Sequence, residues 1–99
     1  MKIIEKLSDM IEEEINDAHK YARCYQSYRE SDSELAKTFS LLSQAELTHV
    51  EMLHAQVVRL IGDYRKKEGE PPEHMKAIYE YLHQRHIEKV NEVKFILEH

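Results

Sequence analysis

The feature that most constrains the fold of this 99-residue chain is the scarcity of residues that stop a helix. The chain contains only two glycines and two prolines, and the prolines are adjacent, at Pro71-Pro72. Proline interrupts a helix because it lacks a backbone N–H, and Gly and Pro also supply most of the turns that a β-rich fold needs. The sequence therefore predicts an all-α protein with long helices and few connections.

The remaining stop signals divide the chain into three expected helices within a single domain of residues 1–99. Their expected ranges are 3–29, then 33–62 or onward towards Gly69, and then 73–97. At 1.5 Å per residue the first two helices are each roughly 40 Å long, and the short connection makes them an antiparallel hairpin. Long antiparallel helices of similar length are typical of a helical bundle.

The boundary between the first two expected helices is a cluster of capping residues. Ser31 stands three residues before Glu34, which is the spacing of a capping box. Asp32 and Ser33 are alternative caps, because each has a side-chain oxygen that can accept a hydrogen bond from the first turn. The cluster predicts a sharp start to the second helix without deciding which of the three residues caps it.

Charge and hydropathy exclude several classes of function. The chain carries 14 basic and 19 acidic residues, and no face rich in Lys and Arg that would bind phosphates. A nucleic-acid partner is therefore not expected. The first residues, Met1 to Lys6, are charged where a signal peptide has its apolar segment, and no apolar run is long enough to cross a membrane. We expect a cytoplasmic protein with no membrane partner.

Each of the first two helices carries an apolar stripe with polar side chains at its centre. The first stripe is Leu7, Ile11, Ala18, Tyr21, Tyr25 and Tyr28, and the second is Leu35, Phe39, Leu42, Leu53, Val57 and Leu60. Glu14 fills the gap in the first stripe. Glu46 and His49, one turn apart, fill the gap in the second, so all three side chains point into the expected core.

The three interrupting side chains are expected at one level of the hairpin. Glu14 stands about 15 residues before the connecting loop, and Glu46 and His49 stand about 14 and 17 residues after it. A carboxylate in a bundle core costs several kcal/mol unless a partner offsets its desolvation. Two such acids beside a histidine predict a bound divalent cation, and Fe, Mn or Zn suits oxygen and nitrogen ligands.

One Glu and one Glu-x-x-His amount to half of a di-iron site. Di-iron bundles use a Glu from each of two helices and a Glu-x-x-His from each of two others. A two-fold dimer of the hairpin would supply four glutamates and two histidines around two iron ions. The sequence therefore predicts a homodimer, or a higher homo-oligomer, that closes a four-helix bundle around iron.

A metal-free alternative stays open. Glu14 could pair with His49 in a hydrogen-bonded polar network that sets the register of the helices, which would make the protein a non-enzymatic assembly or adaptor module. That arrangement leaves Glu46 without an obvious partner, so we favour the metal.

Two segments of the sequence resemble a known family. EINDAHKY (residues 14–21) and AELTHV (residues 45–50) resemble the first half of a rubrerythrin-type domain of the ferritin-like superfamily. In that family a first-helix glutamate, with a tyrosine seven residues on, precedes a Glu-x-x-His on the second helix. The resemblance covers roughly residues 4–60 and implies a ferritin-like helical fold.

The resemblance also implies a set of site residues and an activity. The metal ligands would be Glu14, Glu46 and His49, and Tyr21 would lie close to the metals. Tyr25, one turn further along the same stripe, is the only other tyrosine expected near them. The implied activity is oxidation of Fe(II) with dioxygen or hydrogen peroxide, as in a ferroxidase or a rubrerythrin-like oxidoreductase.

The chain departs from rubrerythrins in two respects. Rubrerythrins carry all four ligand-bearing helices in one chain, whereas residues 1–99 supply two of them. Rubrerythrins also add a cysteine-ligated rubredoxin module, which these residues do not contain. The half-length arrangement is more similar to the encapsulated ferritins, in which two-helix protomers dimerise around a di-iron ferroxidase site inside an encapsulin shell. That similarity implies an encapsulin nanocompartment as a partner and location, although no docking peptide is seen in this sequence.

The third expected helix carries a histidine at the centre of its own apolar stripe. The stripe is Met75, Tyr79, Leu82, His86, Val90 and Val93. We interpret His86 as a hydrogen-bonded interface histidine rather than a ligand. Glu80 and His83 repeat the Glu-x-x-His spacing, as do Glu51 and His54. Because both of these glutamates fall off the apolar stripes, neither pair is expected to bind metal.

Two remaining features carry no functional weight. Cys24 is the only cysteine, so it has no partner for a disulfide or a thiolate metal site, and we expect a partly buried helix residue. The final residues, 97–99, match the start of a common vector-derived histidine tag.

Overall fold

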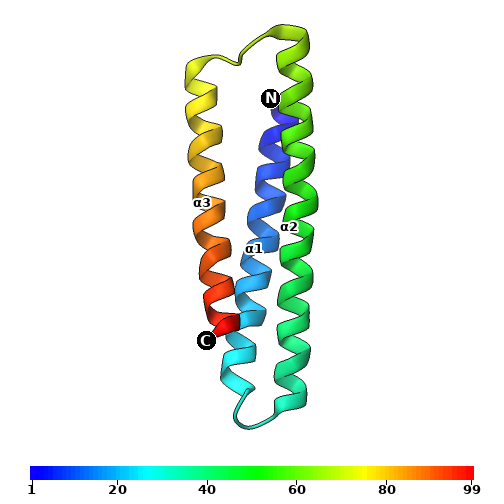
Figure 1. Cartoon of the computed structure of the whole chain (residues 1–99), viewed down its shortest axis with the longest axis vertical. Helices are drawn as coiled ribbons and strands as arrows, with labels where there is room; N and C mark the ends of the chain where they lie inside the picture. The colour runs from blue at the N-terminus through cyan, green and yellow to red at the C-terminus, as the bar shows by residue number, and fades with distance from the viewer.

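The computed structural model of the chain describes all residues 1–99 and consists of three long helices (Figure 1). They are α1 (Lys2–Tyr28), α2 (Ser33–Glu68) and α3 (Glu73–Glu98). No strand is present, so the all-α expectation is confirmed. The second helix takes the longer of its two expected lengths and continues through Gly62. None of the three combines the length and the apolar character that a membrane span requires.

Local signals set the boundaries of α2. Asp32 is the cap that the structure uses, and its side chain accepts a hydrogen bond from the backbone N–H of Leu35 at 3.1 Å. At the other end Gly69 has φ +80°, a conformation that glycine adopts without steric penalty, and its N–H donates to the Arg65 carbonyl. Pro72 then precedes the first turn of α3.

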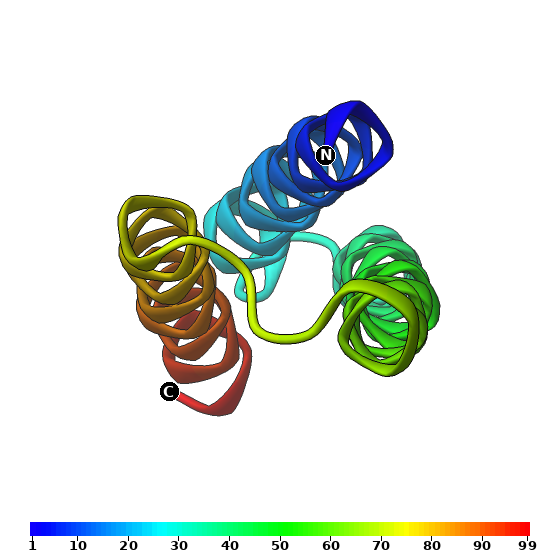
Figure 2. The same ribbon diagram turned by 90° about the horizontal axis from the view of Figure 1, so that it is seen from above.

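The helix α1 is central to the arrangement. It packs antiparallel along α2 and also against α3, whereas α2 and α3 have few contacts with each other. Seen from above, the three helices occupy the corners of a triangle, and the α2–α3 connection crosses the open end (Figure 2). The result is a rod of 55 × 18 × 18 Å.

The buried core lies where α1 meets the other two helices. Ile11 and Ile15 of α1 pack with Val50 of α2 at one level, and Ala18 and Ala22 pack with Leu47 and Val93 at the next. The two alanines allow the helices to approach closely, and Ser43 uses that approach to donate a 2.7 Å hydrogen bond to the Ala18 carbonyl. Small side chains and one satisfied hydroxyl therefore join α1 to α2.

The observed core is rotated relative to the stripes that the sequence predicts. Tyr28, Leu35 and Leu42 were expected inside, but they are 42%, 37% and 40% exposed. Ile15, which is absent from the predicted stripe, is buried. The physical reason is that α3 covers only one flank of the α1–α2 hairpin. The spacing of apolar residues shows that a helix has an apolar face, but not whether another helix covers it.

Candidate metal centre

The three side chains that interrupt the apolar stripes meet midway along the hairpin. The Nδ1 atom of His49 lies 3.4 Å from one carboxylate oxygen of Glu14 and 3.7 Å from one of Glu46. One ligand atom of each residue lies within 4.8 Å of the others. The antiparallel pairing of α1 and α2 therefore brings together residues that are more than thirty positions apart in sequence.

The spacing of these atoms fits a shared cation. Nitrogen and oxygen ligands bind Zn²⁺ and similar ions at about 2.0–2.2 Å, which places two ligands of one ion about 3.0–3.4 Å apart. The 3.4 Å distance from His49 Nδ1 to Glu14 lies at the upper end of that range, and the 3.7 Å distance to Glu46 exceeds it by a few tenths of an ångström. Small side-chain rotations would close the difference, and the donor set of two carboxylates and one imidazole suits Fe, Mn or Zn.

One carboxylate oxygen of Glu46 makes no hydrogen bond. This Oε2 atom is buried, and the His49 Nδ1 atom 3.7 Å away is too distant to donate one. The Glu46 side chain is only 19% exposed, compared with 30% for Glu14 and 50% for His49. An anionic oxygen removed from water without a partner is unfavourable, and a bound cation would compensate it. The metal-free pairing of Glu14 with His49 leaves this atom unsatisfied.

The cluster lies on the flank of the hairpin that faces away from α3. On α1, Glu12 forms an ion pair with Lys89 of α3 at 2.9 Å. Glu14 comes two residues later and so projects about 200° further around the helix. On α2, His54 faces α3, and His49, five residues earlier, projects about 140° away from it. The two helices thus present the cluster to the side that α3 leaves uncovered. The expectation that all three side chains point into the core is therefore wrong for the single chain, because no third helix covers this side of the hairpin.

Exposed apolar side chains surround the cluster on the same flank. We call this surface the open flank; its members are Ile3, Met10, Glu14, Tyr28, Leu35, Leu42, Glu46 and His49. Several stand at steps of seven from the cluster residues, as Leu42 does from His49, and a seven-residue step returns to within about 20° of the same face. The open flank is an apolar strip along both helices with two acids and a histidine at its centre.

The two tyrosines proposed to lie near the metal are further along the hairpin. Tyr21 is seven residues from Glu14, about 10 Å along the helix axis, and its ring stacks with Phe39 at 6.4 Å. Tyr25 is about 16 Å along the axis and lines a groove beside the α1–α2 loop. No hydrogen bond joins either tyrosine to the cluster residues, and the expectation that they lie near the metals stays a prediction.

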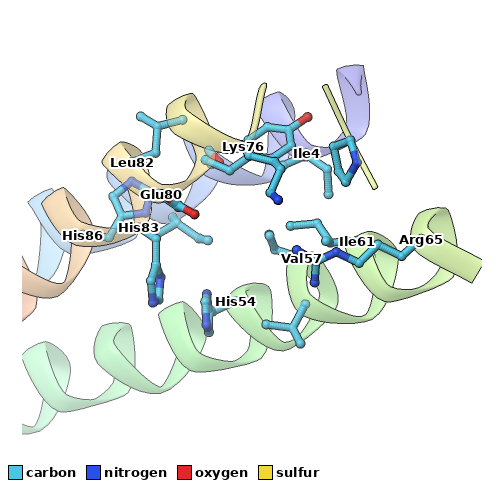
Figure 3. Close-up of a pocket in the computed structure, with 15 residues that line it drawn as sticks. Ile4, His54, Val57, Ile61, Arg65, Lys76, Glu80, Leu82, His83 and His86 are labelled. Carbon is cyan, nitrogen blue, oxygen red and sulfur yellow. The ribbon is translucent and has the colours of Figure 1, made fainter. Parts of the chain in front are cut away.

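A second histidine cluster, which the sequence reasoning dismissed, lies on the other flank. His54 of α2 and His83 and His86 of α3 line a pocket of about 280 Å³ between these helices (Figure 3). His86 was expected to be hydrogen-bonded, and that expectation is wrong: its Nε2 is buried without a partner. The reason is that α2 has few contacts with α3, so no acceptor or donor reaches it. Glu80 also lines this pocket, although it lies off the apolar stripe.

Burial alters the ionisation of two of these histidines. Desolvation lowers the pKa of His54, and the neighbouring His83 lowers it further. Desolvation also lowers the pKa of His86, against the opposing influence of the Glu12 carboxylate. Both side chains therefore favour the neutral imidazole form, which is the form that binds metals.

No protein-family model, curated protein or solved structure matches this chain. The resemblance to rubrerythrin-type domains accordingly stays a prediction. The function has to be inferred from the chemistry of the two clusters themselves.

Proposed function

We propose that this chain is a di-iron carboxylate protein that oxidises Fe(II) with dioxygen or hydrogen peroxide at a site formed between two copies. The observation that carries the proposal is the convergence of Glu14, Glu46 and His49 on the open flank, with one buried oxygen of Glu46 left without a hydrogen bond. Such a donor set suits a divalent cation, and a Glu with a Glu-x-x-His is half of the ligand set of a di-iron bundle, which favours iron.

The need for a second copy follows from the number of ligands. One chain offers two carboxylates and one imidazole, which is fewer groups than a pair of metal ions requires. A second copy approaching through the open flank, related by a two-fold axis, would add the same three groups from the opposite side. The exposed apolar residues Tyr28, Leu35 and Leu42 would be buried in that contact and would help to drive it.

Each protein group has a defined role in this scheme. Glu14 and Glu46 would hold the ions and could bridge them, because each carboxylate has two oxygens. His49 would supply a neutral nitrogen through Nδ1, the ring atom nearest both acids. When bound, the two ions supply the redox chemistry: two Fe(II) release the two electrons that, with two protons, reduce one hydrogen peroxide to two waters. The apolar rim would exclude bulk water from the site.

One observation favours a second candidate function. The 3.4 Å contact between His49 and Glu14 is the polar pair that a metal-free assembly module would use to set its register. It is long for a hydrogen bond, and it does not involve the buried oxygen of Glu46. A protein that self-associates without binding iron would favour this function over the oxidase.

The test is to load the untagged protein with Fe(II) under anaerobic conditions, then add dioxygen or hydrogen peroxide. Iron per chain, the rate of Fe(III) formation and the mass of the assembly are measured for wild type, Glu14→Ala and His49→Ala. We expect one iron per chain, dimers that iron stabilises, and loss of both iron and rate in the variants.

Glu13→Ala is the matched control, because Glu13 is exposed, adjacent to Glu14, and carries the same charge. It should retain the iron content and rate of wild type. A wild-type protein that binds no iron, or a Glu14→Ala variant that oxidises iron at the wild-type rate, would overturn the proposal.

A further inference from the structure

The pocket between α2 and α3 is an elongated space with largely apolar walls. All three helices line it, with Ile4 and Ile11 from α1, Val57 and Ile61 from α2, and Leu82 from α3. Its volume is about 280 Å³. On α2 the lining residues extend from His54 to Arg65, which spans roughly 16 Å along the helix axis. The pocket shares no residue with the open flank.

Protein groups close both ends of the pocket. At the end nearer the middle of the rod, the imidazole rings of His54 and His83 stack across the gap between α2 and α3, with centroids 4.6 Å apart (Figure 3). At the other end lies Pro71, which is buried in the connection between these two helices. Because α2 and α3 have few direct contacts, a ligand would enter between them. The shape therefore suits a narrow, elongated molecule rather than a branched one.

One polar side chain in the pocket lining has an unmet hydrogen-bonding capacity. His86 is only 7% exposed, and its Nε2 atom is buried without a hydrogen-bond partner. Burial lowers the pKa of His86, so its ring is neutral near pH 7. A neutral imidazole has one N–H donor and one nitrogen acceptor, and a hydroxyl group can pair with either. A bound hydroxyl would therefore satisfy Nε2 in both tautomers of the ring.

The charged groups around the pocket favour an uncharged ligand. The cationic side chains at the Pro71 end, Arg65 and Lys76, are both engaged by Glu70, at 3.4 Å and 3.3 Å. They do not offer a free clamp for an anionic headgroup, and the Glu80 carboxylate at the histidine end would repel one (Figure 3). Because Glu80 is exposed, a cationic headgroup would pair with it only in contact with water, where such pairs contribute little.

We propose that this pocket binds a neutral, unbranched alcohol of medium chain length, with its hydroxyl at His86 and its chain along the apolar walls. An apolar cavity of about 150 Å³ holds the carbon atoms of one benzene, so this pocket has room for roughly ten carbons. Each buried methylene should strengthen binding about fourfold. Affinity should therefore rise with chain length and level off at about ten carbons.

The experiment titrates the untagged full chain, prepared without metal, with 1-butanol, 1-hexanol, 1-octanol and 1-decanol. Backbone amide and imidazole NMR resonances locate the binding and give the affinities. We expect the fourfold gain per methylene, with shifts at Ile11, Val57 and the His86 ring, and weaker binding of octanoate and octylammonium than of 1-octanol. Affinity that ignores chain length, tighter binding of either charged analogue, or shifts confined to the open flank would overturn the proposal.

Two variants test the hydroxyl and the chain separately. His86→Leu removes the buried nitrogen and keeps an apolar side chain, so it should weaken 1-octanol binding at least about fivefold. Ile61→Phe leaves that nitrogen in place and fills part of the pocket, so it should weaken 1-decanol more than 1-butanol. Ile61 belongs to neither buried cluster, which makes this variant informative even if His86→Leu fails to fold.

His74→Leu is the matched control, since His74 is exposed at the start of α3 and lies outside the pocket. It should bind 1-octanol as tightly as wild type. Equal affinities of wild type and a folded His86→Leu, or an Ile61→Phe variant with the wild-type dependence on chain length, would refute the assignment. None of these measurements uses iron or alters Glu14, Glu46 or His49, so their outcome is separate from that of the iron proposal.

Discussion

The two flanks of the α1–α2 hairpin carry opposite kinds of site on the same helix. Glu46 and His49 of α2 face the uncovered side, where two carboxylates share one imidazole. His54, just over one turn later, faces a pocket that α3 closes with further histidines. A difference of five residues thus separates an open, acidic cluster from a pocket lined by imidazoles, because rotation around a helix changes the neighbour that a side chain meets.

The comparison also shows how little a short motif determines. The Glu-x-x-His spacing occurs three times, at 46–49, 51–54 and 80–83. In the first, both residues join one cluster. In the second and third, each histidine enters the α2–α3 pocket, and Glu51 points to solvent. The position of each copy relative to the neighbouring helix, and not the motif itself, sets what it can bind.

The largest expected effect is a difference in the rate of iron oxidation between variants of the two Glu-x-x-His copies on α2. Glu46→Ala should lower the rate of Fe(III) formation by more than about 100-fold, because it removes a ligand that carries charge. Glu51→Ala, which removes a glutamate three residues before the other histidine of α2, should leave that rate unchanged. Stopped-flow absorbance of Fe(III) measures both, and equal rates would erase the distinction between the flanks.

Val93→Ala should weaken the packing of α3, the helix that covers one flank and leaves the other open. Val93 is fully buried against Ala18, Ala22 and Leu47, so removing two methyl groups should lower the free energy of unfolding by about 2 kcal/mol. Val58→Ala is the control, because Val58 is 57% exposed and should change stability by less than about 0.5 kcal/mol. Urea denaturation measures both, and similar values would mean that α3 does not pack as described.

Glu46→Gln should act in opposite directions with and without metal. In the metal-free protein it replaces a carboxylate whose Oε2 is buried without a hydrogen bond, so it should raise the free energy of unfolding by about 1 kcal/mol. Glu13→Gln, at an exposed position, should have no such effect. With Fe(II) present the order should reverse, because the amide is a poor ligand. Chemical denaturation of both variants, with and without Fe(II), checks this sign change.

The smallest expected effect is a loss of stability on mild acidification that originates in the histidine pocket. Burial lowers the pKa of His54 and of His86 from the usual 6.5, so the unfolded chain takes up protons at a higher pH than the folded one. The free energy of unfolding is therefore highest, as far as these two histidines are concerned, above about pH 6.5. It falls as the pH drops towards the lower pKa values that the two side chains have in the folded protein. His83 faces His54, and Glu12, Lys89, Arg85 and His83 surround His86.

A second titration lies at lower pH and can be separated. The hydrogen bond from Lys89 lowers the pKa of Glu12, so the stability from that pair is present above the usual value of 4.5 and is lost below it. The change in the free energy of unfolding between pH 5 and 7 should therefore come from His54 and His86, without a contribution from Glu12. His54→Gln should flatten the curve in that window, and an unchanged slope would show that the pocket does not cause it.

Much of the fold could be predicted from local signals along the chain. Asp32, Gly69 and the adjacent prolines mark the helix boundaries because each acts on the backbone within a few residues of itself. The meeting of Glu14 with Glu46 and His49 could also be anticipated, since distance from a short loop sets the level of each residue in an antiparallel hairpin. These inferences need no knowledge of which helix packs where.

The sequence by itself therefore determined the helices, the hairpin and the height of the acidic cluster. Only the tertiary structure decided which flank α3 covers, and hence that Tyr28 and Leu35 are exposed while His86 is buried without a partner. The docking of α3 depends on many weak apolar contacts, such as those that Val93 makes. Their combined energy cannot be predicted from any short segment of the sequence. Periodicity shows that a helix has an apolar side; the neighbour that covers it is chosen by the packing of the whole chain.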